Sequence, residues 1–229
     1  MQIRYLWPTA VGLETHDLPS VMRQDLINVL IRKDQEQPKT GRDQKSWDQF
    51  VQSKKLYSST HYNLFAEAEC HPEVDSIKTF ERFSVQCLKG YLAEAFSMGN
   101  DYEFEFSGRC FGNVQYPGGR TFPHYHQSTD IVLIHYLDVG SGNDPEAMKT
   151  KRHGSHALLL LDPRGAPNFP WFEKLESISP HQGLTILHPG YLWHETNPWR
   201  ETQGTRVCIV VNFQITSPGY GSLHKQITG

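Results

Sequence analysis

The second half of the chain is a series of short apolar stretches separated by glycine and proline turns. These stretches lie at 102–107, 109–116, 131–137, 156–161, 175–178, 184–187 and 206–213. Stretches this short, bounded by turn residues, indicate strands rather than helices. Many short strands in succession predict an antiparallel barrel or a two-sheet jelly roll, which would enclose a buried interior.

The first half of the chain predicts helices. A helix start is expected at 17–20, where Asp and Ser flank a Leu-Pro pair, and apolar residues recur at helical spacing to about Lys33. A second helix is expected between Glu73 and Met98. Short strands are expected at 3–6 and 10–13, and a polar loop from Asp34 to Thr60. The predicted fold is mainly β, with two or more N-terminal helices packed outside one sheet.

Length and charge indicate one domain spanning residues 1–229, with a helix-rich part at 1–100 and the β core at 101–216. The 22 basic and 25 acidic residues are spread evenly, so neither nucleic acid nor a membrane is expected as a partner. The four cysteines are widely spaced, and the N-terminus does not resemble a signal sequence. We therefore expect a cytoplasmic protein, with a homodimer left open.

Two histidines one residue apart, His124 and His126, are the main candidate for chemistry. In an extended backbone both side chains point to the same side, which suits chelation of a divalent metal. The alternative is a pair of surface imidazoles without metal. A third ligand could come from the segment that ends at His194. Arg206 opens the last long strand, where a buried guanidinium would require an anion such as the far carboxylate of a chelating diacid.

The order of these motifs resembles the 2-oxoglutarate/iron(II)-dependent oxygenases, and within them a group of bacterial and phage proteins. The resemblance covers most of the chain except 34–53 and 144–154. The matching motifs are Leu-Trp-Pro-Thr at 6–9, Leu-Pro at 18–19, His-Tyr-His at 124–126, Ile-His-Tyr-Leu at 134–137, Leu-Asp-Pro-Arg at 161–164, Gly183 to Pro189, His194, and Arg206 to Asn212.

The resemblance implies a double-stranded β-helix, cupin-like, with Fe(II) at its mouth, 2-oxoglutarate as cosubstrate and O2 as oxidant. It implies that His124 is the first metal ligand, that His194 is the distal one, and that Arg206 binds the C5 carboxylate of 2-oxoglutarate. Further cofactor contacts are expected from Asn113, Gln115 and Tyr136.

The chain departs from the resemblance at one position. Most of the superfamily has a carboxylate two residues after the first histidine, where this chain has His126. We expect His126 to bind, which gives three imidazole ligands. Asp130, four residues further on, remains the competing third ligand, and the native metal stays open because imidazole binds several metals well.

Four other residues have weaker assignments. His135 is expected to be a packed or rim residue, and His188 to support a metal ligand from outside the coordination sphere. Trp193 and Trp199 could line a substrate mouth, but ordinary rim or core packing is the favoured interpretation, because Trp is highly buried on average.

These observations predict an oxygenase that hydroxylates an unactivated C–H bond of a small molecule or a peptide, with decarboxylation of 2-oxoglutarate to succinate. The first alternative is a cosubstrate-free, three-histidine cupin-type dioxygenase or isomerase, which would not need Arg206. The second is a non-catalytic metal-containing binding protein. The substrate cannot be derived from these patterns, because function depends on the site rather than on the fold.

Overall fold

The computed structural model describes residues 9–36, 62–97, 104–140, 157–163, 174–198 and 204–216. Within them lie two long helices, α1 (Ser20–Glu36) and α3 (Val74–Phe96), and a short 3-10 helix, η1 (Ala68–Cys70). The strands are β1 (Gly12–Thr15), β2 (Phe106–Gln115), β3 (Ile131–Asp138), β4 (Leu158–Leu161), β5 (Leu175–Ile178), β6 (Leu184–Pro189), β7 (His194–Thr196) and β8 (Arg206–Ile215).

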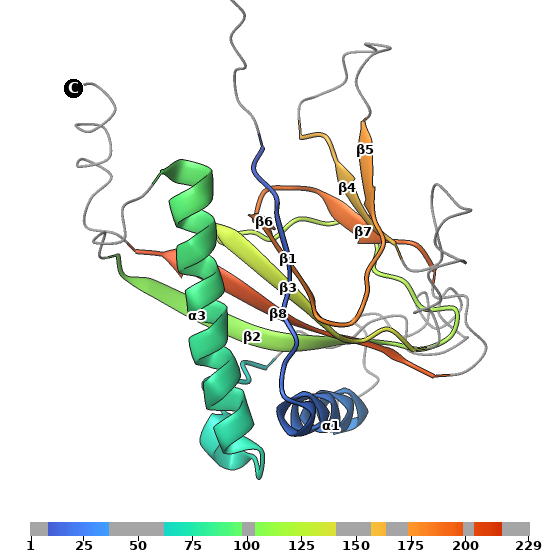
Figure 1. Ribbon diagram of the computed structural model, residues 1–229. Coiled ribbons are helices and arrows are strands. Elements are labelled where there is room, and N and C mark those ends of the chain that lie inside the picture. The colour runs from blue at the N-terminus through green and yellow to red at the C-terminus, as the bar shows by residue number, and fades with distance from the viewer. Residues whose placement is uncertain are drawn as a thin grey trace, which may run out of the picture.

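The strands form two antiparallel sheets. The larger has the order β1-β6-β3-β8-β2 and the smaller has the order β5-β4-β7. The helices cover one face of the larger sheet (Figure 1), where α1 contacts β2, β3 and β8, and α3 contacts β3. This arrangement confirms the expected mainly β fold with two antiparallel sheets and helices packed outside.

The register of the larger sheet divides its residues between two faces. His135 of β3 lies opposite Thr185 of β6 and Ile209 of β8, so these three side chains share a face. The neighbouring residue Tyr136 lies opposite Cys208 and points to the other face. Residues of β8 from 206 to 211 are buried on both faces, as the continuous apolar run predicts.

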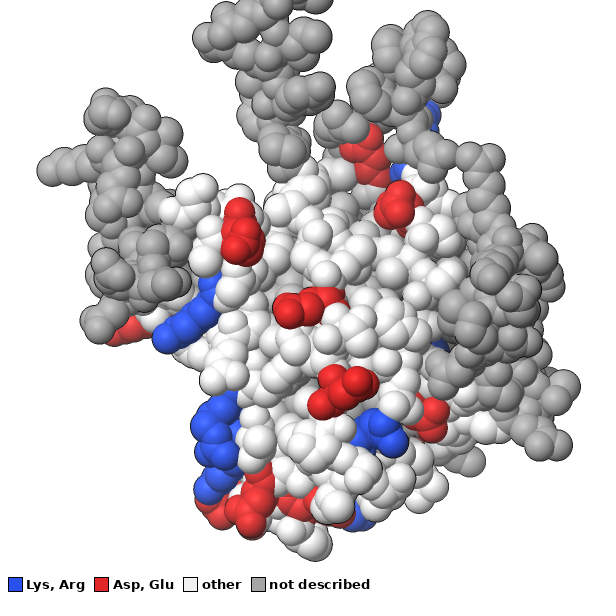
Figure 2. Space-filling model, viewed as in Figure 1, with Lys and Arg blue, Asp and Glu red and all other residues white. Residues whose placement is uncertain are grey.

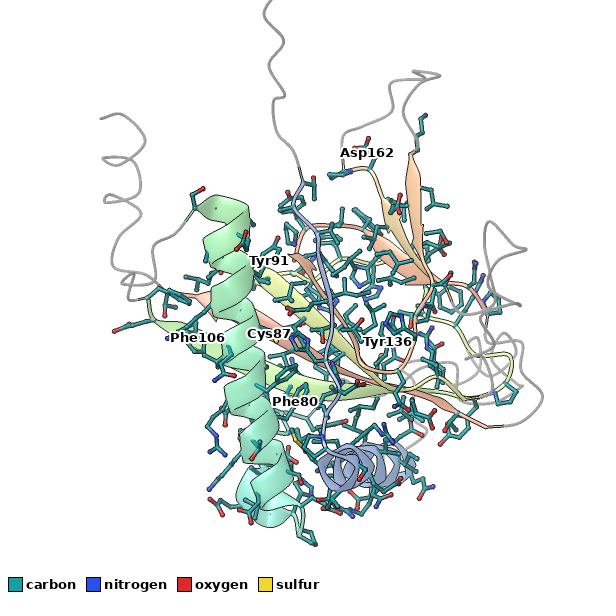
Figure 3. All side chains as sticks on the ribbon, viewed as in Figure 1. Phe80, Cys87, Tyr91, Phe106, Tyr136 and Asp162 are labelled. Atoms are coloured by element: carbon teal, nitrogen blue, oxygen red, sulfur yellow. The ribbon has the colours of Figure 1, made fainter. Side chains whose placement is uncertain are left out.

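One face of the larger sheet is filled by the helices. Phe80 of α3 is fully buried and points toward the sheet (Figure 3), and its ring centroid lies 5.8 Å from that of His135. Leu30 of α1 packs on Gly112 of β2, where an added Cβ would come within 2.7 Å of the leucine side chain. Gly112 therefore allows α1 to approach the sheet closely.

Two expectations were wrong in detail. The stretches 102–107 and 109–116 were expected to form two strands, but Phe106–Gln115 is one strand that pairs along its full length with β8. Asp34 was expected to begin a loop, but it lies in the last turn of α1, where it is buried and accepts a hydrogen bond from the Tyr116 hydroxyl at 3.0 Å. This distant partner allows the helix to bury a carboxylate. The expected strand at 3–6 and the remaining loop up to His61 lie outside the described residues.

The surface seen in Figure 2 carries acidic and basic side chains that are intermixed. Several pair where α1, η1 and α3 meet, for example Arg32 with Glu73 at 2.7 Å. Across the described ranges, no helix combines the length and the apolar character that crossing a membrane requires.

The burial of His135 predicts a loss of stability in acid. Burial, with a smaller contribution from His16, lowers its pKa to about 3, whereas an unfolded histidine titrates near 6.5. As the pH falls below about 6.5, the unfolded chain takes up a proton that the folded chain does not. The free energy of unfolding should therefore fall, by up to about 2 kcal/mol at pH 5 for this residue.

Urea denaturation at pH 7 and pH 5 measures this effect. His135→Gln removes the titrating group and keeps a donor for the Thr185 hydroxyl, which lies 2.8 Å from His135 Nδ1. We expect the variant to lose less stability than the wild type between the two pH values. Equal losses in both proteins would show that His135 does not contribute.

Candidate active site

A backbone bridge brings His124 and His194 together. The amide of His124 donates to the carbonyl of His194 at 3.0 Å, and the reverse bond is 2.9 Å long. Residues paired in this way lie directly opposite each other, so their side chains point to the same side. His126 follows two positions after His124, and its ring centroid is 5.1 Å from that of His124 and 5.2 Å from that of His194. Each ring offers one nitrogen, and these three nitrogens lie within 4.8 Å of one another.

The hydrogen bonds of two rings define which nitrogen is available. His124 Nδ1 donates to the carbonyl of Phe122 at 2.8 Å, and His194 Nδ1 donates to the carbonyl of Leu192 at 2.9 Å. In a neutral ring the other nitrogen, Nε2, then carries the lone pair. Burial is the main cause that lowers the pKa of His194 to about 2 and that of His126 to about 4, and neighbouring histidines add to it. His126 and His194 are therefore neutral at pH 7, as metal binding requires.

Asp130, the competing third ligand, is not part of the cluster of three histidines. It is exposed, and its Oδ2 accepts a hydrogen bond from the amide of Ile215 at 2.7 Å. Its own amide donates to the carbonyl of Phe213 at 2.9 Å. The carboxylate thus extends the pairing of β8, and His126 is the residue that joins the two other histidines. Three imidazoles suit a first-row divalent metal such as iron, zinc, copper or nickel.

Buried polar atoms adjoin the three histidines. His188 has no exposed surface, and its ring centroid is 4.8 Å from that of His194. Its Nδ1 donates to the carbonyl of Pro189, while its Nε2 has no hydrogen-bond partner among the described residues. Asn212 Oδ1 is likewise buried without a partner in the described part of the chain. Both residues lie opposite Val132 and share its face, so a polar ligand here would find acceptors in place.

Arg206 lies on the same face of β8 as Asn212, because the two are separated by an even number of residues. It is 1% exposed, and its guanidinium carbon lies 5.6 Å from the centroid of the Tyr136 ring. Burial raises the pKa of Tyr136 well above its ordinary value, so the phenol stays neutral. A guanidinium remains charged when buried, and its planar fork suits a carboxylate.

The predicted cofactor contacts Asn113 and Gln115 face this interior, but their amide nitrogens are already engaged. Both donate to the hydroxyl of Thr121, at 3.0 and 2.7 Å. Gln115 also donates to the hydroxyl of Thr196 at 3.3 Å, and the Thr121 amide donates to the same oxygen at 2.8 Å. These four residues tie β2 of the larger sheet to β7 of the smaller. The two threonines carry no periodic signal in the sequence and were not predicted.

Two other candidates lie away from the cluster. Trp193 precedes His194 and Tyr125 separates the paired histidines, so in an extended backbone both side chains would point away from the side that the histidines share. Their ring centroids lie 5.0 Å apart, and both side chains are exposed. The idea that Trp193 lines a mouth beside the histidines is not supported by this geometry. His135 faces the helices, and Trp199 lies outside the described residues.

Part of the chain matches a known protein family. Residues 109–212 match the family described as "Putative 2OG-Fe(II) oxygenase". No protein with a curated description matches the sequence.

Solved structures resemble the whole chain at low sequence identity. AviO1 from Streptomyces viridochromogenes Tue57 is 16% identical over 92% of this chain and 91% of its own, with a TM-score of 0.54. The non-haem α-ketoglutarate-dependent epimerase SnoN of nogalamycin biosynthesis is 11% identical over 94% and 84%, with a TM-score of 0.52. HygX from Streptomyces hygroscopicus, solved with nickel and 2-oxoglutarate bound, is 14% identical over 93% and 84%, with a TM-score of 0.49. The fold is the double-stranded β-helix that the sequence predicted.

The close approach of Gly190 to Thr129 gives a test of how His126 is held. A Cβ added to Gly190 would lie 2.0 Å from the carbonyl oxygen of Thr129, and the Gly190 carbonyl accepts the amide of His126 at 2.9 Å. Gly190→Ala should therefore displace the segment that carries His126 and weaken Co(II) binding by at least about tenfold, as misplacing a ligand does. Chelator competition measures the affinity.

The matched control is Gly90→Ala, because nothing lies within 4 Å of a Cβ at Gly90 on α3. It should leave the metal affinity unchanged and stabilise the helix slightly. Equal affinities in Gly190→Ala and wild type would mean that His126 is not part of the metal site.

Proposed function

We propose a reaction for this chain from the premise that it is an oxidoreductase of the 2-oxoglutarate- and Fe(II)-dependent oxygenase type, as its residues 109–212 indicate. The reaction is hydroxylation of an unactivated C–H bond in a small molecule or a peptide. Decarboxylation of 2-oxoglutarate to succinate accompanies it, and O2 is the oxidant. The supporting observation is the convergence of three histidines on the side of the large sheet that also holds a buried arginine.

The proposal assigns roles to individual residues. His124, His126 and His194 would hold the iron through three imidazole nitrogens. Arg206 would pair with the C5 carboxylate of 2-oxoglutarate. When bound, iron and 2-oxoglutarate supply the oxidising chemistry, which couples loss of CO2 to oxidation of the substrate.

The chain's own contribution is to bind, orient and exclude water. The backbone carbonyls of Phe122 and Leu192 fix two of the rings, so no reorganisation is needed when metal arrives. Because Arg206 is buried against Tyr136, its ion pair with a carboxylate would form away from water, where charge pairing is stronger. Thr121 and Thr196 hold the two sheets at a fixed separation around this space.

The cosubstrate-free cupin-type enzyme is disfavoured by Arg206. A three-histidine enzyme that binds only its substrate has no use for a cation at that position. A non-catalytic metal-binding protein would have the same histidines but would not turn over 2-oxoglutarate.

Turnover of 2-oxoglutarate by anaerobically iron-loaded protein tests the proposal. Succinate should form on admission of O2 and should be lost in His124→Ala, His126→Ala and His194→Ala. Asp130→Ala should retain turnover, because its carboxylate contacts the amide of Ile215 instead. Arg206→Gln should weaken 2-oxoglutarate binding by about two orders of magnitude, the usual effect of breaking a buried charge pair.

Trp193→Ala is the matched control, since it alters the residue next to His194 on the outward face of the strand. Its turnover should stay within about twofold of the wild type. Iron-loaded protein that neither binds 2-oxoglutarate nor forms succinate would contradict the oxygenase and favour the cosubstrate-free enzyme. If turnover were lost in Asp130→Ala and retained in His126→Ala, the third metal ligand would be Asp130 and not His126.

A further inference from the structure

His188 is buried beside the three clustered histidines without being one of them. It lies on β6, and its side chain has no exposed surface. Its ring meets that of His194 nearly edge-on, with the centroids 4.8 Å apart and an interplanar angle of 65°. The group of nitrogens that could hold a metal comprises those of His124, His126 and His194 and not that of His188. His188 is therefore a neighbour of the metal site, and coordination does not explain it.

One nitrogen of the His188 ring is satisfied and the other is not. Nδ1 donates to the carbonyl of Pro189 at 2.9 Å. In a neutral ring Nε2 then carries the lone pair and can only accept. This Nε2 is buried and has no hydrogen-bond partner among the described residues. A buried acceptor without a donor is unfavourable, so a donor on a bound ligand is the expected partner.

The register of the larger sheet shows where Nε2 points. His188 lies opposite Val132, which is on the same face of β3 as Tyr136, so His188 faces the interior and not the helices. Nε2 lies across the ring from the main chain and therefore extends deeper into the interior than Nδ1. Asn212 lies opposite Val132 from the other side, and its Oδ1 is a second buried acceptor without a described partner. One row of the sheet thus carries two acceptors that lack donors.

This row lies far from Arg206, to which the proposed function assigns the cosubstrate. Asn212 is six positions after Arg206 on β8, which corresponds to about 20 Å along the strand. A five-carbon diacid spans about 6 Å, and an extended arginine side chain adds about 7 Å. A diacid held by Arg206 therefore ends short of the row of His188. The acceptors of that row are left to the substrate.

We propose that His188 determines substrate specificity: its Nε2 accepts a hydrogen bond from a hydroxyl or amine group that the substrate carries close to the carbon to be oxidised. The inference deepens the proposed function and rests on it, because a metal at the three histidines defines where oxidation occurs. The substrate class is a small molecule with a hydrogen-bond donor. A hydrocarbon, an ether or a proline residue, which has no N–H, would leave Nε2 unpaired and would be rejected.

Binding of matched fragments to protein loaded with Co(II) and 2-oxoglutarate tests the inference. The probes are benzyl alcohol with benzyl methyl ether, cyclohexanol with methoxycyclohexane, and aniline with N,N-dimethylaniline. Faster NMR relaxation of the probe protons near Co(II) restricts the measurement to fragments bound at the metal site. The wild type should bind the uncapped member of a pair at least about tenfold more tightly than the methyl-capped one, because the capped fragment leaves the buried acceptor unpaired.

Variants of His188 show whether its acceptor causes this preference. His188→Leu removes the acceptor and should abolish the preference, whereas His188→Gln keeps a side-chain oxygen at a similar reach and should retain it. If His188→Leu folds poorly, His188→Phe, which is closer in shape, should give the same result. Ile186→Val is the matched control, because Ile186 is buried on the same face of β6 two residues away and has no polar side-chain atom. It should leave the preference unchanged.

A merely structural role of His188 gives a different result. If His188 only packs on His194, His188→Leu would weaken Co(II) binding and leave the ratio of affinities within each pair unchanged, which would overturn the inference.

The outcomes also separate the two proposals. A wild type that binds Co(II) and 2-oxoglutarate but binds both members of each pair equally, or binds no uncapped fragment, would overturn the role of His188 and leave the proposed function intact. A wild type that binds neither Co(II) nor 2-oxoglutarate would contradict the proposed function, and the inference with it.

Discussion

The alternation of side chains along the central strands is the constraint on which the rest of the structure depends. In β3 and β8, one set of residues faces the helices and the next set faces the interior between the sheets. His135 is packed against Phe80 for this reason, while its neighbour Tyr136 contacts Arg206. A slip of one residue in the register would exchange these two environments. Core packing and the chemistry of the interior are therefore specified together, and neither can change alone.

The second sheet completes the site because it is joined both to β2 and to the segment that connects β2 with β3. The bridge between His124 and His194 brings two metal-binding candidates into direct opposition. The hydrogen bonds from Gln115 to Thr121 and Thr196 hold the sheets together further along the same interior. These contacts bury polar groups, which is favourable only because nearly every donor has an acceptor. Among the described residues, His188 Nε2 and Asn212 Oδ1 are buried without a partner on this interior face, where a polar ligand would satisfy them.

The sequence predicted those helices and strands that local residue patterns determine. The helices at Ser20–Glu36 and Val74–Phe96 follow from helical spacing of apolar residues, and β8 follows from an uninterrupted apolar run. The three histidines were predicted from spacing and resemblance together. The roles of Asn113 and Gln115 were not predicted, because their threonine partners are fixed by the meeting of two sheets. The burial of Asp34 likewise depends on a hydroxyl 82 positions away.

The same alternation limits how a substrate could reach the metal. Tyr125 and Trp193 are exposed aromatic residues next to metal-binding candidates, and such residues often serve ligand binding. Each is separated from a histidine by a single position, however, so the backbone that directs the histidine inward directs the aromatic ring outward. Their ring contact stabilises the outer face of the bridge between the two segments. Selection among substrates must therefore come from inward-facing side chains, and the aromatic pair packs on the outside of the bridge.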